Sequence, residues 1–473
     1  MSPAVETYEQ AIEYLFGRIN YERIHAAEFS ARDFKLDRMR LLLQALGNPQ
    51  ESIPCVHIAG TKGKGSTAVM ISHILTAAGY RTGLFTSPHI DAFEERMKVD
   101  GVTPSREALV GLVNDLAPVI TKLDRMPGRM NPTYFEIATA MAWSFFAQRD
   151  TDIVVLEVGL GGRLDSTNLC NPLVTVITSI SRDHINVLGS SIREIAREKA
   201  GILKDNVPVV SGVTDPEASD QIRKQSIERN ASLIEIGAHI HVESSQDSPN
   251  RSDAPTINVV TPWREWNHIP QPLIGNHQAN NVALAVTVAD VLGDLGFHVP
   301  SQAAHRGLNS VRWPLRIEIV GRDPTVIVDA AHNWESIKAL LSTLDSHFTA
   351  GRRILIFATT KDKDVAGMLR LLTPRFDTVI LTQYQNNPRA ETVSHLRQVL
   401  SANSDQPVHD APDPATAWKL AQHLARAGDL VCITGSFFIA AEMREIVTDC
   451  ANQPASATKA NSSAETKPLP ATG

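Results

Sequence analysis

The chain of 473 residues lacks the features that mark several large classes of protein. It has no run of about 18 apolar residues, so we expect no membrane span. Its four cysteines are scattered without a C-x-x-C pair, which excludes the usual spacing of a zinc site or a disulfide framework. A formal net charge of -7 disfavours a general nucleic-acid binder. The acidic start MSPAVETYEQ lacks the pattern of a signal peptide, so we expect a cytoplasmic protein.

Runs typical of strands alternate with runs typical of helices along most of the chain. After a helical region at 6–46, strands are expected at 54–59, 82–86, 152–158, 173–178 and 207–211. Helices are expected at 105–121, 133–148, 191–203 and 278–294. Such alternation builds a largely parallel sheet covered by helices on both faces, and ligands bind at the carboxyl ends of its strands.

A second, shorter series of alternating runs follows. Its strands are expected at 325–328, 354–357, 378–381 and 430–434, and its helices at 334–346, 363–372, 390–401, 414–426 and 436–448. We therefore expect an N-terminal domain at 1–310, a smaller α/β domain at 311–450 and a disordered tail at 451–473. The Ser-, Asp- and Pro-rich segment 243–256 predicts an exposed loop.

A glycine-rich stretch, HIAGTKGKGST (57–67), lies between the first strand-like run and a helix-like run. Such a turn directs backbone N–H groups and a helix N-terminus at one small volume that favours a polyphosphate. Lys64 adds a positive charge, and Ser66 or Thr67 can offer a hydroxyl to Mg²⁺. The strict P-loop pattern fails, because only Thr61 and Lys62 separate the first Gly from the Gly-Lys pair. A flexible surface turn is the alternative, but the strand before and the helix after favour a nucleoside triphosphate site.

Polar residues follow the other expected strands of the first series. Glu157 ends one of them and precedes the turn GLGGRLD (159–165), a place typical of a carboxylate that associates with Mg²⁺. Ser87 ends another and can offer a hydroxyl. His184 can hold a metal or a phosphate or be structural, and the sequence leaves both open. The spacing of Lys199 favours a solvated helix lysine, although a CO₂ adduct would make it an anionic ligand.

The second series carries its own polar residues. Asp329 ends a strand in DAAHN (329–333), and Arg316 in WPLR (313–316) lies at the expected hinge. An arginine at a hinge reaches nucleotide phosphates only when the domains close. The stretch TKDKD (360–364) is superficially similar to a guanine-reading motif, but Lys363 stands where that motif needs Asp.

Together these motifs are similar to those of the folylpolyglutamate synthase/dihydrofolate synthase family, a branch of the Mur-ligase-like ATP-dependent amide ligases. The similarity spans residues from about 10 to 448 and rests on AGTKGKGST (59–67), LFTSPHI (84–90), FE (135–136), LEVGLGGRLDSTN (156–168), DH (183–184), EKAGILK (198–204), GNHQANN (275–281), WPLR, DAAHN and DKD (362–364). The resemblance implies an α/β fold: a Mur-ligase-like ATPase domain with a mostly parallel sheet, followed by a smaller Rossmann-like domain.

The resemblance also implies roles for individual residues. The ATP-binding set would be Gly60, Thr61, Gly63, Lys64, Gly65, Ser66, Asn281, Arg316 and Asp329. The set that binds two Mg²⁺ ions would be Ser87, Glu157, His184 and a carbamylated Lys199. The residues near the pterin position of relatives are Thr133, Phe135 and Asp165. Catalysis would fall to Lys64, Lys199, His184 and Arg316.

Three positions depart from the family's pattern. Lys62 replaces the commoner Asn of the phosphate loop, Leu315 replaces the Gly of P-G-R, and Ala330 replaces the frequent Gly before Ala-His-Asn. These substitutions bear on local backbone geometry more than on the chemistry.

The function that the resemblance implies is ATP-dependent ligation of L-glutamate to dihydropteroate, to folate polyglutamates, or to both, through an acyl phosphate. We expect a monomer that acts on small molecules, with neither nucleic acid nor a membrane as partner. One alternative is a Mur ligase acting on a cell-wall precursor. It is disfavoured because only about 50 residues precede the loop and Mur ligases usually carry a further N-terminal domain. The other two alternatives are a P-loop NTPase and a non-catalytic nucleotide-binding module.

Overall fold

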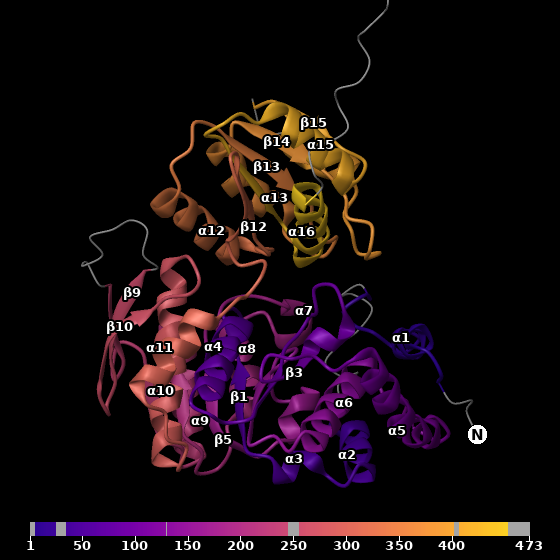
Figure 1. Cartoon of the computed structure of the whole chain (residues 1–473), viewed down its shortest axis with the longest axis vertical. Coiled ribbons are helices and arrows are strands. Elements are labelled where there is room, and N and C mark those ends of the chain that lie inside the picture. The colour runs from indigo at the N-terminus through magenta and orange to yellow at the C-terminus, as the bar shows by residue number, and fades with distance from the viewer. Residues whose placement is uncertain (1–4, 25–34, 129, 245–254, 402–405, 453–473) are drawn as a thin grey trace, which may run out of the picture.

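The computed structural model describes residues 5–24, 35–128, 130–244, 255–401 and 406–452. These residues form two α/β units, the first below the second in Figure 1. Most of the expected loop at 243–256, and the tail from residue 453, lie outside the described residues. Among the helices of the described ranges, none has the length and hydropathy of a membrane span.

The first unit is built on a seven-stranded sheet with the order β3-β2-β4-β1-β5-β6-β7. All its strands run parallel except β3, which pairs antiparallel with β2. Their bounds are β1 (Cys55–Ala59), β2 (Thr82–Phe85), β3 (Met97–Val99), β4 (Ile153–Glu157), β5 (Pro172–Ile177), β6 (Val209–Ser211) and β7 (Leu233–Glu235). Because β1 lies between β4 and β5, the residues after these three strands meet at the carboxyl edge of the sheet.

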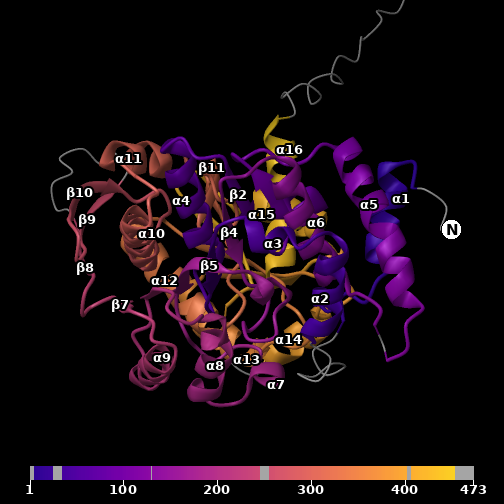
Figure 2. The same cartoon turned by 90° about the horizontal axis from the view of Figure 1, so that it is seen from below.

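Helices cover both faces of this sheet, because the strands are apolar and buried on both sides. Val56 and Ile58 of β1 belong to a core with α4 and with α10 (Asn276–Asp294), whereas Val154 and Leu156 of β4 belong to a core with α2, α5 and α6. In Figure 2, α4 and α10 lie to the left of the sheet and α2, α5 and α6 to its right. The helices are α1 (Tyr8–Phe16), α2 (Leu36–Ala45), α3 (Pro49–Ser52), α4 (Lys64–Ala77), α5 (Arg106–Asp124), α6 (Tyr134–Gln148), α7 (Ile185–Leu188), α8 (Ile192–Lys199) and α9 (Pro216–Glu228). Short 3₁₀ turns lie at Phe93–Arg96, Ser166–Leu169 and Ala200–Ile202.

A small antiparallel sheet with the order β10-β9-β8 flanks the first unit (Figure 1). Its strands are β8 (His241–Ser244), β9 (Thr256–Val260) and β10 (Glu265–Pro270), so β8 and β9 border the expected loop. Two helices follow, α10 (Asn276–Asp294) and α11 (Ser301–Ser310). Both pack on α4, which ties them to the phosphate loop.

The second unit holds a six-stranded sheet with the order β11-β12-β16-β13-β14-β15, parallel except for β11. The strands are β11 (Glu318–Arg322), β12 (Thr325–Val328), β13 (Arg353–Phe357), β14 (Thr378–Leu381), β15 (Val408–Asp410) and β16 (Leu430–Thr434). The helices are α12 (Trp334–His347), α13 (Val365–Leu372), α14 (Val393–Ser401), α15 (Pro414–Leu424) and α16 (Phe437–Asn452), with a 3₁₀ turn at Thr373–Arg375. Core clusters lie on both faces of the sheet.

The expected α/β class is confirmed, and the differences are local. The helical region at 6–46 contains two separate helices, α1 and α2. The helix expected at 191–203 ends at Lys199 and continues as a 3₁₀ turn, whereas α16 extends two residues into the expected tail. Edge strands of three residues, such as β3 and β15, are too short to show an alternating pattern, and the sequence did not predict them.

Candidate functional site

The phosphate loop connects β1 to α4 at the carboxyl edge of the first sheet. Gly60 has a φ of 157°, and a Cβ there would collide with the Thr178 side chain. Gly63 has a φ of 84° and precedes α4, and a Cβ there would lie 2.5 Å from Oδ1 of Asn281. Gly65 lies so close to the Trp313 ring that a Cβ would be 2.9 Å from it. The glycines therefore let neighbouring groups approach the backbone closely.

Hydrogen bonds from the end of β5 hold the loop in shape. The Thr61 N–H donates to the Ser179 carbonyl at 2.7 Å, and the Lys62 N–H donates to the Ser179 hydroxyl at 3.0 Å. The Thr178 hydroxyl donates to the Lys62 carbonyl at 2.6 Å. Ser66 is buried in the first turn of α4. A preformed loop of this kind spends little conformational entropy when it receives an anion.

Helix α10 adds an amide to the same loop. The Thr67 hydroxyl donates to Oδ1 of Asn281 at 3.3 Å, and Nδ2 of Asn281 donates to the Gln278 side chain at 2.7 Å. Both amide side chains are buried. The structure thus places Asn281 beside the loop, as its expected role in ATP binding requires.

Glu157 and Ser87 meet at the ends of β4 and β2. The Ser87 N–H donates to Oε2 of Glu157 at 3.1 Å, and Glu157 is only 5% exposed. Burial raises the pKa of the Glu157 carboxyl, and the positive charges of Lys64 and Arg316 oppose this rise. Mg²⁺ in nucleotide sites is usually held by one or two carboxylates together with phosphate oxygens. A buried carboxylate beside a hydroxyl residue and the phosphate loop fits such an ion.

Lys199 is buried beneath the loop, at the end of α8. Its Nζ donates to the Gly60 carbonyl at 2.8 Å, and 4% of the residue is exposed. Burial, together with the charge of Lys64, lowers the pKa of Lys199 to about 7. The solvated lysine that spacing favoured is therefore not what the structure contains. An amine of this pKa is in part uncharged at neutral pH, which is the form that reacts with CO₂.

His184 follows β5 and precedes α7, with a φ of 49°. Desolvation by the surrounding protein, with contributions from the charges of Lys363 and Lys199, lowers the pKa of His184, although Asp183 opposes the shift and 44% of the side chain is exposed. The neutral form of the ring is able to ligate a metal. Among the described residues, no three His, Cys, Asp or Glu side chains gather into a metal site. The pair His184 and Lys199 fits a second Mg²⁺ only with an added oxygen ligand, because an amine does not suit this ion.

Arg316 and Asp329 reach the site from the second unit. Asp329 follows β12, accepts hydrogen bonds from the Ile317 N–H at 3.0 Å and the Ala331 N–H at 2.9 Å, and is buried. Burial raises the pKa of Asp329, while the charge of Arg316 opposes the rise. Arg316 also interacts with Glu157 of the first unit, so its guanidinium lies within the field of both carboxylates.

The substitution Leu315 lies beside Arg316 in a left-handed backbone conformation, with a φ of 61°. This conformation favours glycine, which accounts for the Gly in the family's P-G-R. Leu315 retains the conformation because its side chain is fully buried in the core of the second unit. Ala330 is not among the residues with positive φ, so a side chain is tolerated there.

Replacing Leu315 tests whether burial of its side chain offsets the cost of its left-handed backbone conformation. We expect Leu315→Ala to unfold more easily than Leu315→Gly, the reverse of the usual order for these residues. Both variants lose a buried leucine, worth about 2–5 kcal/mol, but only Gly escapes the left-handed penalty of about 1 kcal/mol. Urea unfolding of the wild type and both variants measures the order. An alanine variant as stable as the glycine variant would show that the backbone relaxes at this position.

Two of the three residues expected near a pterin, Phe135 and Asp165, border the glycine-rich turn after β4. Thr133 caps α6 and is buried, and the Phe135 ring lies so close to Gly159 that a Cβ there would collide with it. Asp165 accepts from the Leu160 N–H at 2.8 Å and from Thr167, so its carboxylate already shapes this turn. The structure thus brings Phe135 and Asp165 to this turn and places Thr133 at the start of the same helix as Phe135.

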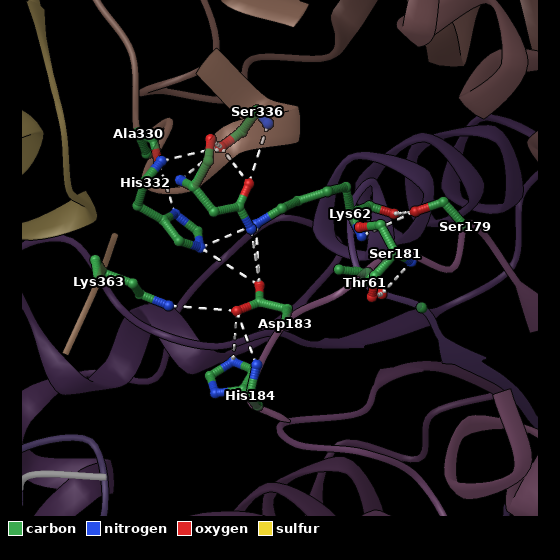
Figure 3. A network of polar contacts seen from close by, with 12 residues as sticks. Thr61, Lys62, Ser179, Ser181, Asp183, His184, Ala330, His332, Ser336 and Lys363 are labelled. Atoms are coloured by element: carbon green, nitrogen blue, oxygen red, sulfur yellow. Dashed lines mark hydrogen bonds and ion pairs between the residues drawn. The ribbon is translucent and has the colours of Figure 1, made fainter. Parts of the chain in front are cut away.

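A polar network between the two units was missed by the sequence analysis (Figure 3). Its centre is Asp183, which is 8% exposed at its side chain and bonds to residues of both units. Burial alone would raise the pKa of Asp183, but Lys62 and other neighbouring positive groups hold it well below its usual range. The available signal was an acid in the loop between β5 and α7, beside His184. The unusual Lys62 is part of the same network.

Two family models match the chain. The model of the Mur ligase middle domain matches residues 58–289, and the model of the Mur ligase, glutamate ligase domain matches residues 315–437. Their order follows the two units of the fold.

Curated relatives match along nearly the whole chain. The dihydrofolate synthase/folylpolyglutamate synthase of Bacillus subtilis is 36% identical over 440 residues, which are 93% of this chain and 98% of the relative. The protein of the same name from Escherichia coli is 31% identical over 439 residues, 93% of this chain and 96% of the relative.

Solved structures agree with the sequence relatives. Escherichia coli FolC in complex with DHPP and ADP superimposes with a TM-score of 0.82 at 29% identity, covering 96% of this chain and 100% of that chain. Mycobacterium tuberculosis folylpolyglutamate synthase complexed with ADP and AMPPCP gives a TM-score of 0.83 at 32% identity, with coverage of 93% and 98%. The chain belongs to the dihydrofolate synthase/folylpolyglutamate synthase family of Mur-ligase-like enzymes.

Proposed function

We propose that this protein is an ATP-dependent ligase that joins L-glutamate by an amide bond to dihydropteroate, to the γ-carboxylate of folate polyglutamates, or to both. The observation that carries the proposal is the convergence of two units on one place. The first unit supplies the phosphate loop and the buried Glu157, and the second supplies Arg316 and Asp329. A relative was solved with both ADP and DHPP, which supports a nucleotide and a pterin as ligands.

The chemistry follows from making an amide in water. A carboxylate is a poor electrophile because oxide would have to leave, so the carboxylate attacks the γ-phosphorus of ATP and ADP departs. The amine of glutamate then attacks the acyl phosphate carbon, loses a proton and expels inorganic phosphate. Lys64 and Arg316 offset negative charge where the carboxylate approaches the phosphates. Closure of the second unit excludes water, which would otherwise hydrolyse the acyl phosphate.

The residues that would hold magnesium are Ser87, Glu157 and His184, with Lys199 as a carbamate. Bound Mg²⁺ would neutralise phosphate charge and orient the γ-phosphoryl group. The chain's own contribution is to bury one carboxylate beside Lys64 and to keep the Lys199 amine close to its uncharged form.

The division into domains at 1–310 and 311–450 is likewise a proposal, supported by the two sheets and by the packing of α11 on α4 of the first unit. A Mur ligase that acts on a cell-wall precursor receives less support, because the relatives that span nearly the whole chain carry the folate-enzyme names. A monomeric state and a cytoplasmic location stay predictions.

One assay separates the possible acceptors. The purified protein is incubated with ATP, Mg²⁺ and L-glutamate and with either dihydropteroate or tetrahydrofolate. The masses of the products are then measured by mass spectrometry. We expect a product one glutamyl residue heavier than at least one acceptor, together with ADP and phosphate. ATP hydrolysis at a rate independent of both acceptor and glutamate would instead support a simple NTPase.

A further inference from the structure

Between the two units lies a buried carboxylate that the proposed reaction does not use, that of Asp183. It follows β5 of the first unit and collects donors from both units (Figure 3). Its Oδ2 accepts from Nζ of Lys62 at 3.3 Å and from Nδ2 of Asn333 at 3.1 Å. Its Oδ1 accepts from Nζ of Lys363 at 3.3 Å. Because Lys62 lies in the phosphate loop, whereas Asn333 and Lys363 lie in the second unit, this carboxylate joins the two units.

The two lysines approach Asp183 from different units, Lys62 from the first and Lys363 from the second. Their side chains are 28% exposed at Lys62 and 14% exposed at Lys363, so water screens their charges only in part. Burial lowers the pKa of Lys62 to about 8; Lys363 and Lys64 add to the shift, and Asp183 opposes it. The lysines therefore repel one another, and the carboxylate between them offsets that repulsion.

His332 of the second unit adds a contact to the same lysine. Nζ of Lys62 lies 2.9 Å from Nε2 of His332, whose Nδ1 lies 2.9 Å from the Ala330 carbonyl. This pattern fits a neutral ring that donates through Nδ1 and accepts through Nε2. The ammonium of Lys62 is thus shared between Asp183 and His332, one from each unit.

We propose that Asp183 is a positioning residue: its negative charge allows the second unit to close on the phosphate loop by neutralising Lys62 and Lys363. Without that charge, the two lysines would hold the units apart. The inference rests on the proposed function only for the reason why the two units close. The closure itself is measured without substrates.

The proposal predicts how two substitutions combine. Asp183→Asn keeps the size of the side chain but removes the charge, so the units should open. Adding Lys62→Asn to that variant removes one of the two cations, so the units should close again. A merely structural role for Asp183 would leave the double variant as open as the single one, because nothing would then depend on the charge of Lys62.

Closure is measured by the distance between two spin labels in the protein without nucleotide. Native Cys450 on α16 is exposed and the other three cysteines are buried, so labelling is selective once Lys224 on α9 is changed to Cys. We expect the distance distribution between the labels to become longer and broader in D183N. In K62N/D183N it should return toward the distribution of the wild type. A second double variant, K363Q/D183N, removes the cation that the second unit contributes. Its distance distribution should also return toward that of the wild type. Recovery in neither double variant would overturn the proposal.

Kinetics give an independent readout in the active enzyme. We expect D183N to raise KM for glutamate by about tenfold with a smaller change in kcat, and K62N/D183N to recover most of that loss. Additive losses in the double variant would contradict the proposal. If the protein shows no ligase activity at all, the label distances still decide the role of Asp183.

Discussion

Lys199→Ala should lose ligase activity by a factor on the order of a thousand and regain part of it when a short carboxylate such as formate is added. The reason is the buried amine, whose pKa of about 7 leaves much of it uncharged and able to add CO₂. The resulting carbamate would supply the oxygen ligand that His184 and Lys199 otherwise lack for Mg²⁺. Initial rates with and without formate measure both effects.

Lys204→Ala is the matched control, because Lys204 lies in the same EKAGILK motif. Its Nζ donates to the Asn168 carbonyl at 2.8 Å and to the Asn168 side chain at 3.0 Å, away from the phosphate loop. This variant should keep its activity and show no response to formate. Carbon-13 NMR after equilibration with labelled bicarbonate should show a carbamate signal in the wild type and in Lys204→Ala only. Wild-type activity in Lys199→Ala would refute the carbamate.

Glu157→Gln should lower kcat by roughly a thousandfold, equivalent to about 4 kcal/mol of transition-state stabilisation. The amide keeps the shape of the side chain and still accepts from the Ser87 N–H. It removes the negative charge that would hold Mg²⁺ and that now balances Lys64 and Arg316. Rates measured over a range of Mg²⁺ concentrations should show a much weaker dependence on the ion.

Asp290→Asn provides the comparison for Glu157→Gln. Asp290 is also 5% exposed and binds Arg264 and Trp266 within the first unit. Its neutralisation should lower stability without changing the Mg²⁺ dependence of the folded enzyme. A Glu157→Gln enzyme with the wild-type Mg²⁺ dependence would remove Glu157 from the proposed metal site.

Local patterns in the sequence predicted the architecture and the carboxyl-edge residues well. The alternation of apolar strands with helices is a local signal, and residues that follow parallel strands meet at one edge whatever the connecting loops do. Gly60, Glu157 and Lys199 were expected near one another on these grounds or from the family resemblance, and the structure brings them together.

Three features lay beyond the sequence analysis for physical reasons. The contacts of Asp183 join residues 121, 150 and 180 positions apart, and no local pattern encodes such pairs. The spacing of Lys199 indicated a solvated helix face, but burial by the phosphate loop overrides that indication. The left-handed backbone at Leu315 is equally invisible in sequence, because leucine rarely adopts it.

The central claim is that ATP is spent on activating a carboxylate for attack by glutamate. The most direct measurement uses an acceptor whose reacting carboxylate carries oxygen-18 and follows that label into inorganic phosphate by mass spectrometry. The account predicts one labelled oxygen in the phosphate for each amide formed, because the carboxylate oxygen bridges carbon and phosphorus in the acyl phosphate. Phosphate that carries oxygen from solvent water alone, with the label retained in the acceptor, would contradict the account.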